Sequence, residues 1–363
     1  MTRKKAVVAM SGGVDSSVAA ALLVEAGYDV TGIMLKLWRG EAANNDSGCC
    51  NVGAAEDARR VADTLGIPFY VLNFAERFEE TVVANFHADY AAGRTPNPCV
   101  RCNQWVKFGS LMERAEALGA DVLATGHYAR INNDGDRPRL LRGVDRAKDQ
   151  SYVLWMLGPH DLARTMFPVG ELQKSETRRI AASLGLRTAA KPDSQEICFV
   201  PGGDFGAYVD ESIPDAAAPG PILQTDGREI GTHKGIGHYT VGQRKGLGIS
   251  LGHPVFVNAI DRDRNAIVVG DRSDLAVAGC TVQEVGYVQT LSDGDRVLVQ
   301  HRAHGDAFPA TVWVKRDRAE VQFDAPVEAV APGQSAAFYS IDDPEELLGG
   351  GVIAATHPVA VAV

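Results

Sequence analysis

The sequence lacks the features expected of a membrane protein or of a protein that coats nucleic acid. Its 363 residues contain no apolar run of the roughly 18 residues that a membrane-spanning helix needs. Lys and Arg number 36 against 46 Asp and Glu, and the resulting net charge of −10 argues against non-specific binding along nucleic acid. A local basic patch for one folded RNA stays compatible with that charge. The basic stretch 1–5 leads into an apolar run too short for a signal peptide, so we expect a cytoplasmic protein.

Cysteine is also scarce, with six residues in the chain. In a cytosolic protein of this size, such cysteines indicate catalysis or metal binding better than a disulfide framework. Cys99 and Cys102 form a CxxC between Pro98 and Asn103, but no second CxxC or nearby His pair completes a zinc site. We expect the two prolines of the segment 94–103 to keep it extended, because proline disfavours helix in the residue before it. The cysteines outside this segment and the Cys198 region are expected to be structural or loop thiols: Cys49, Cys50 and Cys280.

Strand and helix signals alternate from the N-terminus to about residue 130. Short apolar runs predict strands at 6–10, 30–35, 69–72 and 121–124, and amphipathic stretches predict helices at 14–26, 54–65, 75–90 and 106–118. This alternation is typical of an α/β domain with a parallel sheet covered on both faces. Ligands of such domains bind where the carboxyl ends of the strands meet the loops.

The pattern changes after about residue 201. Residues 202–252 are rich in glycine and basic residues and show weak periodicity. Period-2 segments then follow, separated by turn signals, at 266–269, 296–299, 310–314 and 336–339. This spacing predicts a small antiparallel β-barrel at the C-terminal end of the chain.

The loop Ser-Gly-Gly-Val-Asp-Ser at 11–16 joins the first predicted strand to the first helix. Gly12 and Gly13 allow the backbone to approach an anion closely, and the helix N-terminus adds unsatisfied N–H donors. Asp15 would repel a bare phosphate, so Mg²⁺ is expected as a mediator. The spacing fits neither a Walker A loop nor a dinucleotide fingerprint. It resembles the PP-loop of ATP pyrophosphatases, which split ATP between the α and β phosphates; the alternative is a glycine turn with a helix cap.

Longer blocks of the sequence resemble the tRNA-specific 2-thiouridylases. They are NPxxxCN at 97–103, ATGHYA at 124–129, KDQSY at 148–152, DSQEICF at 193–199 and GHYTVGQRKGLG at 237–248. The resemblance implies an α/β parallel-sheet PP-loop domain at 1–205, a small central tRNA-binding domain at 206–275 and a C-terminal antiparallel β-barrel at 276–363. It also implies an ATP-dependent enzyme that thiolates C2 of the wobble uridine in tRNA, with the Glu, Gln and Lys tRNAs as substrates. A sulfur carrier or a cysteine desulfurase would be its partner.

The resemblance assigns roles to individual residues. Cys198 would carry a persulfide, and Cys102 would attack it as a nucleophile and leave a transient disulfide between the two. Residues expected to bind ATP are Ala9, Met10, Ser11, Gly12, Gly13, Val14, Asp15, Ser16, Leu35 and Gly126. Those expected at the target base are Asn97, Pro98 and Cys99, and those expected to contact tRNA are Lys148, Asp149, Gln150, Arg302 and Ala303.

Cys99 departs from the commoner family pattern, in which an Asp proposed as a general base stands at this position. A thiol is a poorer base near neutral pH, since its reference pKa is about 8.5. Two hypotheses for sulfur delivery therefore stay open. In the first, the Cys198 persulfide delivers sulfur and Cys99 plays no part; in the second, Cys99, Cys102 and Cys198 hold a [4Fe–4S] cluster whose fourth iron binds sulfide.

Five cationic residues are candidate phosphate contacts, with solvated surface charge as the alternative for each: Lys148, Arg178, Lys191, Arg244 and Lys245. His127 could assist catalysis or be a packed, hydrogen-bonded histidine at a strand end. The rival functions are an amide-forming synthetase with the same nucleotide loop and a non-catalytic RNA-binding module. The first would need an ammonia-handling segment that the sequence does not show, and the second is disfavoured by the intact loop and both cysteines.

Overall fold

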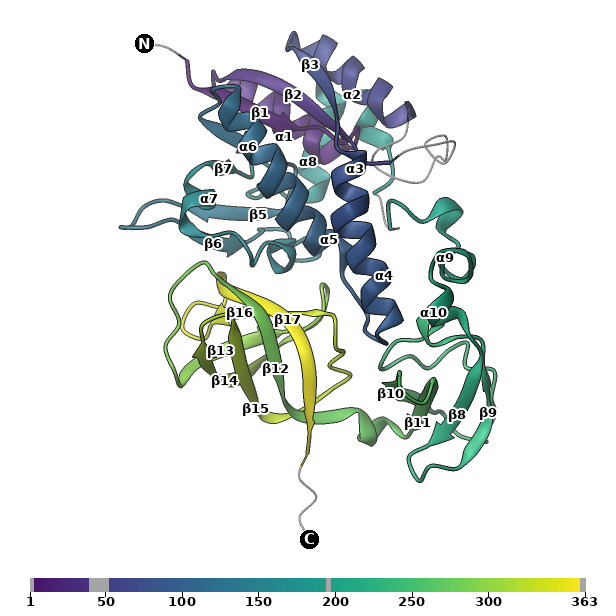
Figure 1. Ribbon diagram of the computed structural model, residues 1–363. Helices are drawn as coiled ribbons and strands as arrows, with labels where there is room; N and C mark the ends of the chain where they lie inside the picture. The colour runs from purple at the N-terminus through teal and green to yellow at the C-terminus, as the bar shows by residue number, and fades with distance from the viewer. Residues whose placement is uncertain (1–2, 39–51, 194–196, 360–363) are drawn as a thin grey trace. The chain divides into compact units, whose positions relative to one another are not determined.

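The computed structural model describes residues 3–38, 52–193 and 197–359 (Figure 1). The chain divides into two compact units. The first comprises Met1–Val82, Pro98–Gly203 and Glu345–Leu347, and the second comprises Val83–Asn97, Asp204–Pro344 and Leu348–Val363. Cys49, Cys50 and residues 194–196 of the Cys198 block lie outside the described residues. None of the described helices combines the length and apolar character that crossing a bilayer demands.

The first unit is built on a five-stranded parallel sheet in the order β3-β2-β1-β4-β7. Its strands are β1 (Lys5–Ala9), β2 (Asp29–Lys36), β3 (Phe69–Asn73), β4 (Val122–Ala124) and β7 (Thr165–Met166). The helices α1 (Val14–Glu25), α2 (Val52–Leu65) and α8 (Lys174–Ser183) share one apolar core with these strands (Figure 1). Val8 of β1 and Val18 of α1 are fully buried in that core. The prediction of an α/β domain with a parallel sheet is confirmed.

The prediction that residues 94–103 are extended throughout is wrong from Pro98 onward. Helix α5 (Pro98–Arg101) begins at this proline, continues as the π-helix η3 (Cys102–Ser110) and ends with α6 (Leu111–Ala117). A proline in the first helical turn is well tolerated, because the N–H it lacks would have no partner there. Both thiols of the CxxC therefore lie on helix rather than on an extended loop. The wider π-helical turn that starts at Cys102 is a feature found often at functional sites.

The segment predicted as one helix at 75–90 has a π-helical interruption. It consists of α3 (Ala75–Phe78), the π-helix η2 (Glu79–Val83) and α4 (Ala84–Ala91). The structure also contains elements that the sequence pattern does not predict. They include the hairpin of β5 (Ala129–Asn132) and β6 (Arg139–Arg142), α7 (Pro159–Ala163), and the 3-10 helices η4 (Ser151–Val153) and η5 (Arg187–Ala190). Within the first unit, β6 pairs with Glu346 and Leu347.

The second unit contains a four-stranded sheet in the order β10-β11-β8-β9. Its strands are β8 (Gly220–Gln224), β9 (Glu229–His233), β10 (Phe256–Asp261) and β11 (Ala266–Gly270), preceded by the helices α9 (Phe205–Ser212) and α10 (Pro214–Ala217). The weakly periodic stretch 202–252 thus holds regular elements. The segment 266–269, which by its period resembles the barrel strands, is β11 of this sheet, because it pairs with β8 and β10.

The C-terminal part of the second unit is a closed antiparallel barrel, as predicted. The strands β12 (Ala276–Tyr287), β15 (Arg318–Glu328), β14 (Ala307–Lys315), β13 (Asp295–Gln300), β16 (Ser335–Ser340) and β17 (Glu346–Pro358) follow one another, and β17 pairs with β12 to close the ring. In β15, buried and exposed side chains alternate from Arg318 to Asp324, as expected for a barrel strand, whereas β16 is buried along nearly its whole length. Val297, Val312 and Phe338 fill the interior.

Candidate active site

The loop at 11–16 is folded around its own hydroxyl groups. The backbone N–H of Ser11 donates to Oγ of Ser16 at 3.1 Å, and this Oγ lies 3.2 Å from the carbonyl oxygen of Gly13, to which it donates. Gly12 has φ +71°, and a Cβ there would lie 2.3 Å from the carbonyl oxygen of Ala54 on α2. The loop therefore requires glycine at this position both for its backbone conformation and for its close contact with α2.

Asp15, in the first turn of α1, is held by two side chains from distant parts of the first unit. Nζ of Lys174 lies 2.6 Å from Oδ1 and 2.8 Å from Oδ2 of Asp15. The hydroxyl of Tyr128 donates to Oδ1 at 2.9 Å, and burial followed by the nearby Asp15 charge raises the pKa of Tyr128 above its usual value. Tyr128 belongs to a block that resembles the family, whereas Lys174 lies outside every such block. Sequence reasoning therefore missed Lys174.

A second carboxylate, Asp193, receives three cations. Lys148 Nζ lies 2.8 Å from its Oδ2, and Lys174 Nζ and Arg178 Nη2 lie 2.9 Å and 2.8 Å from its Oδ1. Burial alone would raise the pKa of Asp193, but the hydrogen bonds from Lys148 and Lys174 outweigh it and lower the pKa to about 2. We call the loop at 11–16 the nucleotide loop, after its predicted ligand. Lys174 thus bridges its carboxylate, Asp15, to the carboxylate that begins the Cys198 block.

Lys191 adds a fourth positive charge beside the loop. Its Nζ donates to the carbonyl oxygen of Gly12 at 3.1 Å and to Asp57 of α2 at 2.9 Å. Arg178 also donates to the carbonyl oxygen of Lys191 at 2.8 Å. We name Lys148, Lys174, Arg178 and Lys191 the cation cluster. Three of its members are candidate phosphate contacts from the sequence, and their contact with a phosphate stays a prediction. The other two candidates, Arg244 and Lys245, belong to the second unit.

The segments that carry Cys102 and Cys198 both pack against α3. The helix η3, which begins at Cys102, is in contact with α3. Phe199, next to Cys198, meets the ring of Phe78 on α3 edge to face, with the ring centroids 5.7 Å apart. Cys102 is buried and Cys198 is half-buried. The fold therefore brings two segments that are far apart in sequence to one helix of the first unit.

Cys99 is exposed on α5. Among the residues that the structure describes, no three Cys, His, Asp or Glu side chains gather closely enough to hold a metal ion. This absence concerns a site for a single ion, and the [4Fe–4S] cluster on Cys99, Cys102 and Cys198 stays a hypothesis.

Gly126 and His127 follow β4, beside the loop. A Cβ on Gly126 would lie 2.6 Å from the backbone nitrogen of Ser16, so this position approaches the start of α1 as closely as a glycine allows. Nδ1 of His127 lies 2.5 Å from Oγ1 of Thr125, and burial together with the Lys107 charge holds the pKa of His127 well below 6.5. His127 is therefore a neutral, packed histidine. Leu35 is buried near the end of β2, and its contact with adenine stays a prediction.

Asp149 and Gln150, expected at the tRNA, are engaged with their own surroundings. The Asp149 carboxylate accepts hydrogen bonds from the backbone and hydroxyl of Ser151 and from Arg142, the last at 2.9 Å. Oε1 of Gln150 accepts from the backbone N–H of Tyr128 at 3.0 Å. These bonds fix the shape of the segment that carries Lys148, whose side chain is partly exposed.

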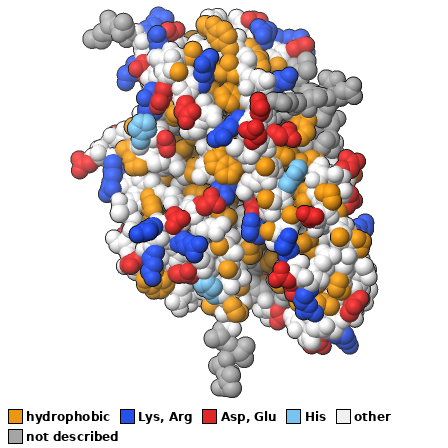
Figure 2. All heavy atoms as spheres, viewed as in Figure 1, with side chains coloured by type: hydrophobic (Ala, Val, Ile, Leu, Met, Phe, Trp, Pro, Cys, Tyr) orange, Lys and Arg blue, Asp and Glu red, His pale blue; other side chains and the backbone are white. Residues whose placement is uncertain are grey.

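Arg302 and Ala303 follow β13 in the barrel. Nη2 of Arg302 donates to the carbonyl oxygen of Ala329 at 3.0 Å, and the amide of Gln300 donates to the carbonyl oxygens of Arg302 and Ala303. The backbone here is thus held by side chains of the barrel itself. On the face shown in Figure 2, Lys and Arg side chains are interspersed with Asp and Glu, in keeping with the net charge of −10.

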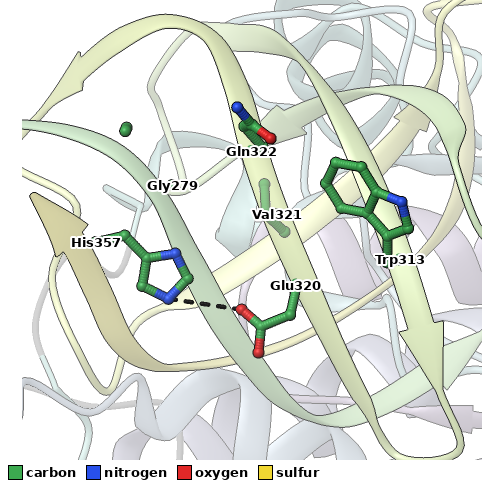
Figure 3. Close-up of a pocket in the computed structure, with 7 residues that line it drawn as sticks. Gly279, Trp313, Glu320, Val321, Gln322 and His357 are labelled. Atoms are coloured by element: carbon green, nitrogen blue, oxygen red, sulfur yellow. Dashed lines mark ion pairs between the residues drawn. The ribbon is translucent and has the colours of Figure 1, made fainter. Parts of the chain in front are cut away.

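The barrel also has a surface pocket of about 300 Å³. Trp313, Glu320, Gln322 and His357 line it, and Nε2 of His357 lies 3.5 Å from Glu320 (Figure 3). No residue predicted for ATP, sulfur or the target base is part of its lining. The pocket therefore adds nothing to the candidate catalytic site of the first unit.

Comparison with known proteins defines the class of the protein. Three family models match in succession: the tRNA methyl transferase HUP domain at residues 4–202, the tRNA methyl transferase PRC-barrel domain at 206–271 and the aminomethyltransferase beta-barrel domain at 277–353. The chain is thus an ATP-using HUP-domain protein followed by two β domains, in agreement with the phosphate loop and cation cluster.

Curated relatives define the family more narrowly. The tRNA-specific 2-thiouridylase MnmA of Roseiflexus castenholzii is 50% identical over 370 residues, which cover 96% of this chain and 99% of the relative. The proteins of the same name from Chloroflexus aurantiacus and Natranaerobius thermophilus are 48% and 46% identical, with 96% and 97% of this chain covered and 98% of each relative. The chain belongs to the tRNA-specific 2-thiouridylase family, which confirms the resemblance seen in its sequence.

Proposed function

We propose that this chain, a tRNA-specific 2-thiouridylase by family, thiolates the wobble uridine by adenylating the C2 oxygen and then transferring sulfur from a persulfide on Cys198. One observation carries the proposal. The nucleotide loop, the cation cluster and the two segments that bear Cys102 and Cys198 are all parts of the first unit. A nucleotide and a sulfur nucleophile can therefore be held by one sheet and its helices.

In the first step, the C2 oxygen of uridine attacks the α-phosphorus of ATP. The bond between the α-phosphorus and the bridging oxygen breaks, and pyrophosphate leaves with the electron pair. Positive charge beside the loop stabilises the charge that develops on the leaving group, which is the main task of an enzyme in phosphoryl and nucleotidyl transfer. Lys174 and Lys191 are the residues of the cation cluster that contact the loop directly.

In the second step, the terminal sulfur of the Cys198 persulfide adds at C2, and AMP leaves with the C2 oxygen. The Cys102 thiolate then attacks Sγ of Cys198, the bond to the transferred sulfur breaks, and 2-thiouridine is released. A disulfide between Cys102 and Cys198 remains, and a thiol reductant must supply two electrons to reset the enzyme. A site from which water is excluded favours sulfur over hydroxide as the nucleophile at C2, and the thiol proposed to attack Cys198, Cys102, is buried.

Asp15 is the carboxylate best placed to bind a Mg²⁺ ion that accompanies ATP, and such an ion would spread the charge of the phosphates. Both oxygens of Asp15 are in contact with Lys174, so the ion and this lysine would share the carboxylate. We favour persulfide delivery over a [4Fe–4S] cluster because it needs only Cys102 and Cys198, whose segments both pack against α3, and we propose no step through a cluster. Anaerobic purification of the wild type and a Cys99→Ala variant, with iron analysis, tests this choice: iron lost together with activity contradicts it.

Substrate and partners follow from the same proposal. We infer that the Glu, Gln and Lys tRNAs bind in the cytoplasm, and that a cysteine desulfurase or a sulfur carrier loads Cys198. The target base would meet Asn97, Pro98 and Cys99, and the ATP contacts would be those of the loop with Leu35 and Gly126. The proposed tRNA contacts are Lys148, Asp149, Gln150, Arg302 and Ala303.

Mass spectrometry of nucleosides tests the function itself. The protein is incubated with ATP, a sulfur source and unmodified tRNA, and the tRNA is then digested. We expect 2-thiouridine at the wobble position only when ATP is present. Its absence with sulfide, with a desulfurase and cysteine, and with a persulfide donor contradicts the proposed function.

A further inference from the structure

We infer that Asp193 competes with the polyphosphate of the nucleotide for the cation cluster. When Asp193 binds these cations again after the reaction, it promotes the release of pyrophosphate. The inference rests on the proposed function only in placing ATP phosphates at the 11–16 loop. It assigns to Asp193 the role of holding the side chains of the cation cluster, without contact to the nucleotide itself.

The geometry around Asp193 is the geometry of an anion site that is already filled. Lys148, Lys174 and Arg178 approach the two carboxylate oxygens at 2.8–2.9 Å, the length of charge-assisted hydrogen bonds. Ammonium and guanidinium groups are also the donors that bind phosphate oxygens best. A phosphate group that entered this site would need the same N–H donors that now point at Asp193.

Lys174 makes the exchange possible without loss of the loop contacts. Its ammonium group has three N–H donors and contacts both Asp15 and Asp193. Lys174 can therefore keep its bond to Asp15 while it replaces Asp193 with a phosphate oxygen. Its side chain is largely buried, with 12% of the surface exposed, so it stays near the loop in either arrangement.

The balance of charge around the cluster decides whether removing the Asp193 charge raises or lowers the affinity for the nucleotide. The side chains of the cation cluster pair with three carboxylates: Asp15 with Lys174, Asp57 with Lys191, and Asp193 with Lys148, Lys174 and Arg178. The charge of a fourth carboxylate, Asp145, also acts on Lys148. A polyphosphate with several negative charges thus enters a site whose positive charge is mostly neutralised. Removing the charge of Asp193 leaves more of that positive charge for the nucleotide.

The same competition affects the rate at which pyrophosphate leaves after the reaction. Once AMP has been transferred, pyrophosphate holds the cations until another anion takes its place. Asp193 is tethered beside them and acts at a high effective concentration, so it can displace pyrophosphate more readily than a free anion can. A carboxylate in this position therefore weakens ATP binding in return for faster release of the product.

Isothermal titration of ATP and of pyrophosphate into the full-length protein tests the inference through an Asp193→Asn variant. We expect both ligands to bind about fivefold more tightly to the variant than to the wild type, which corresponds to roughly 1 kcal/mol. Pyrophosphate should also inhibit thiolation by the variant at a lower concentration. Asp193→Glu keeps the charge and should restore wild-type affinity.

Whether Asp193→Asn gains or loses affinity for ATP separates competition from the alternatives. If Asp193 only shapes the site, or binds Mg²⁺ for the nucleotide, Asp193→Asn weakens ATP binding or leaves it unchanged, and the inference is overturned. Glu176→Gln is the matched control, because it removes a carboxylate of α8 that pairs with Arg179; its affinity for ATP should equal that of the wild type. An equal gain of affinity in this control would also overturn the inference, since it would reveal a general charge effect.

Two further arms keep the test decisive. If Asp193→Asn does not fold, as judged by thermal unfolding, Asp193→Ser carries the same prediction in a smaller side chain. The titrations contain no tRNA, so they do not depend on thiolation. Failure of the wild type to bind ATP would contradict the proposed function, whereas wild-type binding with a weaker Asp193→Asn variant would contradict this inference alone.

Discussion

Nζ of Lys174 lies 2.6 Å from Oδ1 of Asp15, although 159 positions separate the two residues in the chain. The contact joins the first turn of α8 to the first turn of α1. It supplies the nucleotide loop with a positive charge that the loop sequence itself lacks. Walker A loops carry their own lysine, whereas this loop obtains one from a distant helix.

Lys174→Met should therefore weaken ATP binding strongly. Loss of a hydrogen-bonding partner with full charge typically costs about 1.5–3 kcal/mol, so we expect KM for ATP to rise about tenfold or more. Steady-state thiolation at varied ATP concentration measures the effect. Arg179→Ala, on the same helix but exposed and paired with Glu176, should leave KM for ATP unchanged.

Gly12→Ala should abolish nucleotide binding, because the new Cβ would lie 2.3 Å from the carbonyl oxygen of Ala54 and push the loop away from α2. Gly185→Ala is the matched control: Gly185 has φ +68°, close to the +71° of Gly12, but a Cβ on Gly185 would meet no atom within 4 Å. The control should lose only about 1 kcal/mol of stability and keep its affinity for ATP. Thermal unfolding and ATP titration of both variants check this prediction, and equal losses of affinity would refute the steric explanation.

The three described cysteines outside position 99 should respond differently to substitution. Cys102→Ser and Cys198→Ser should each eliminate 2-thiouridine while ATP binding stays intact, because neither contributes to the nucleotide loop. Cys280 is fully buried in the barrel, where burial raises the pKa of its thiol to about 12. Cys280→Ala should retain activity and lose about 1 kcal/mol of stability through a small cavity. Thiolation that survives in Cys198→Ser would speak against the persulfide.

His301 should make the protein less stable in mild acid. Burial and the neighbouring Arg302 lower the pKa of this side chain to about 4, and among the described residues its Nδ1 has no hydrogen-bonding partner. The unfolded chain binds a proton near pH 6.5, whereas the folded protein does so only near pH 4, so the free energy of unfolding falls as the pH drops through this window. The loss amounts to about 3 kcal/mol.

Thermal unfolding between about pH 7.5 and pH 4 measures this effect, because the range spans both pKa values. His301→Leu removes the titrating group, so its melting temperature should decline less with falling pH than that of the wild type. His160→Leu, which changes an exposed histidine, should follow the wild-type curve. Parallel curves for His301→Leu and the wild type would show that His301 does not control acid stability.

The sequence is sufficient to predict the parallel sheet and the barrel because their signals are local. Strands β1, β2 and β3 are short apolar runs that are each followed by a helix, and barrel strands such as Arg318–Glu328 alternate between buried and exposed side chains. The glycines of the nucleotide loop are equally informative, since a close backbone approach leaves few alternatives to glycine.

The helix formed by α5 and η3, which carries Cys99 and Cys102, and the cation cluster are harder to predict, for different reasons. Pro98 is compatible both with an extended segment and with the first turn of a helix, and only packing in the folded protein decides between them. Lys174 and Asp193 meet through tertiary structure, and no periodicity in a sequence reports a contact between side chains so far apart. The sequence leaves the role of His127 open for the same reason: its burial beside Thr125 is a property of the fold.

Transfer of labelled sulfur in a single turnover tests persulfide delivery from Cys198 most directly. Cys198 is loaded with radioactive sulfur by a cysteine desulfurase, free sulfide is removed, and ATP with unmodified tRNA is added. We predict that the label moves from the protein to the wobble uridine only with ATP, and that a disulfide between Cys102 and Cys198 forms in equal amount. Label that stays on the protein, or that reaches the tRNA without ATP and without the disulfide, would contradict this delivery route.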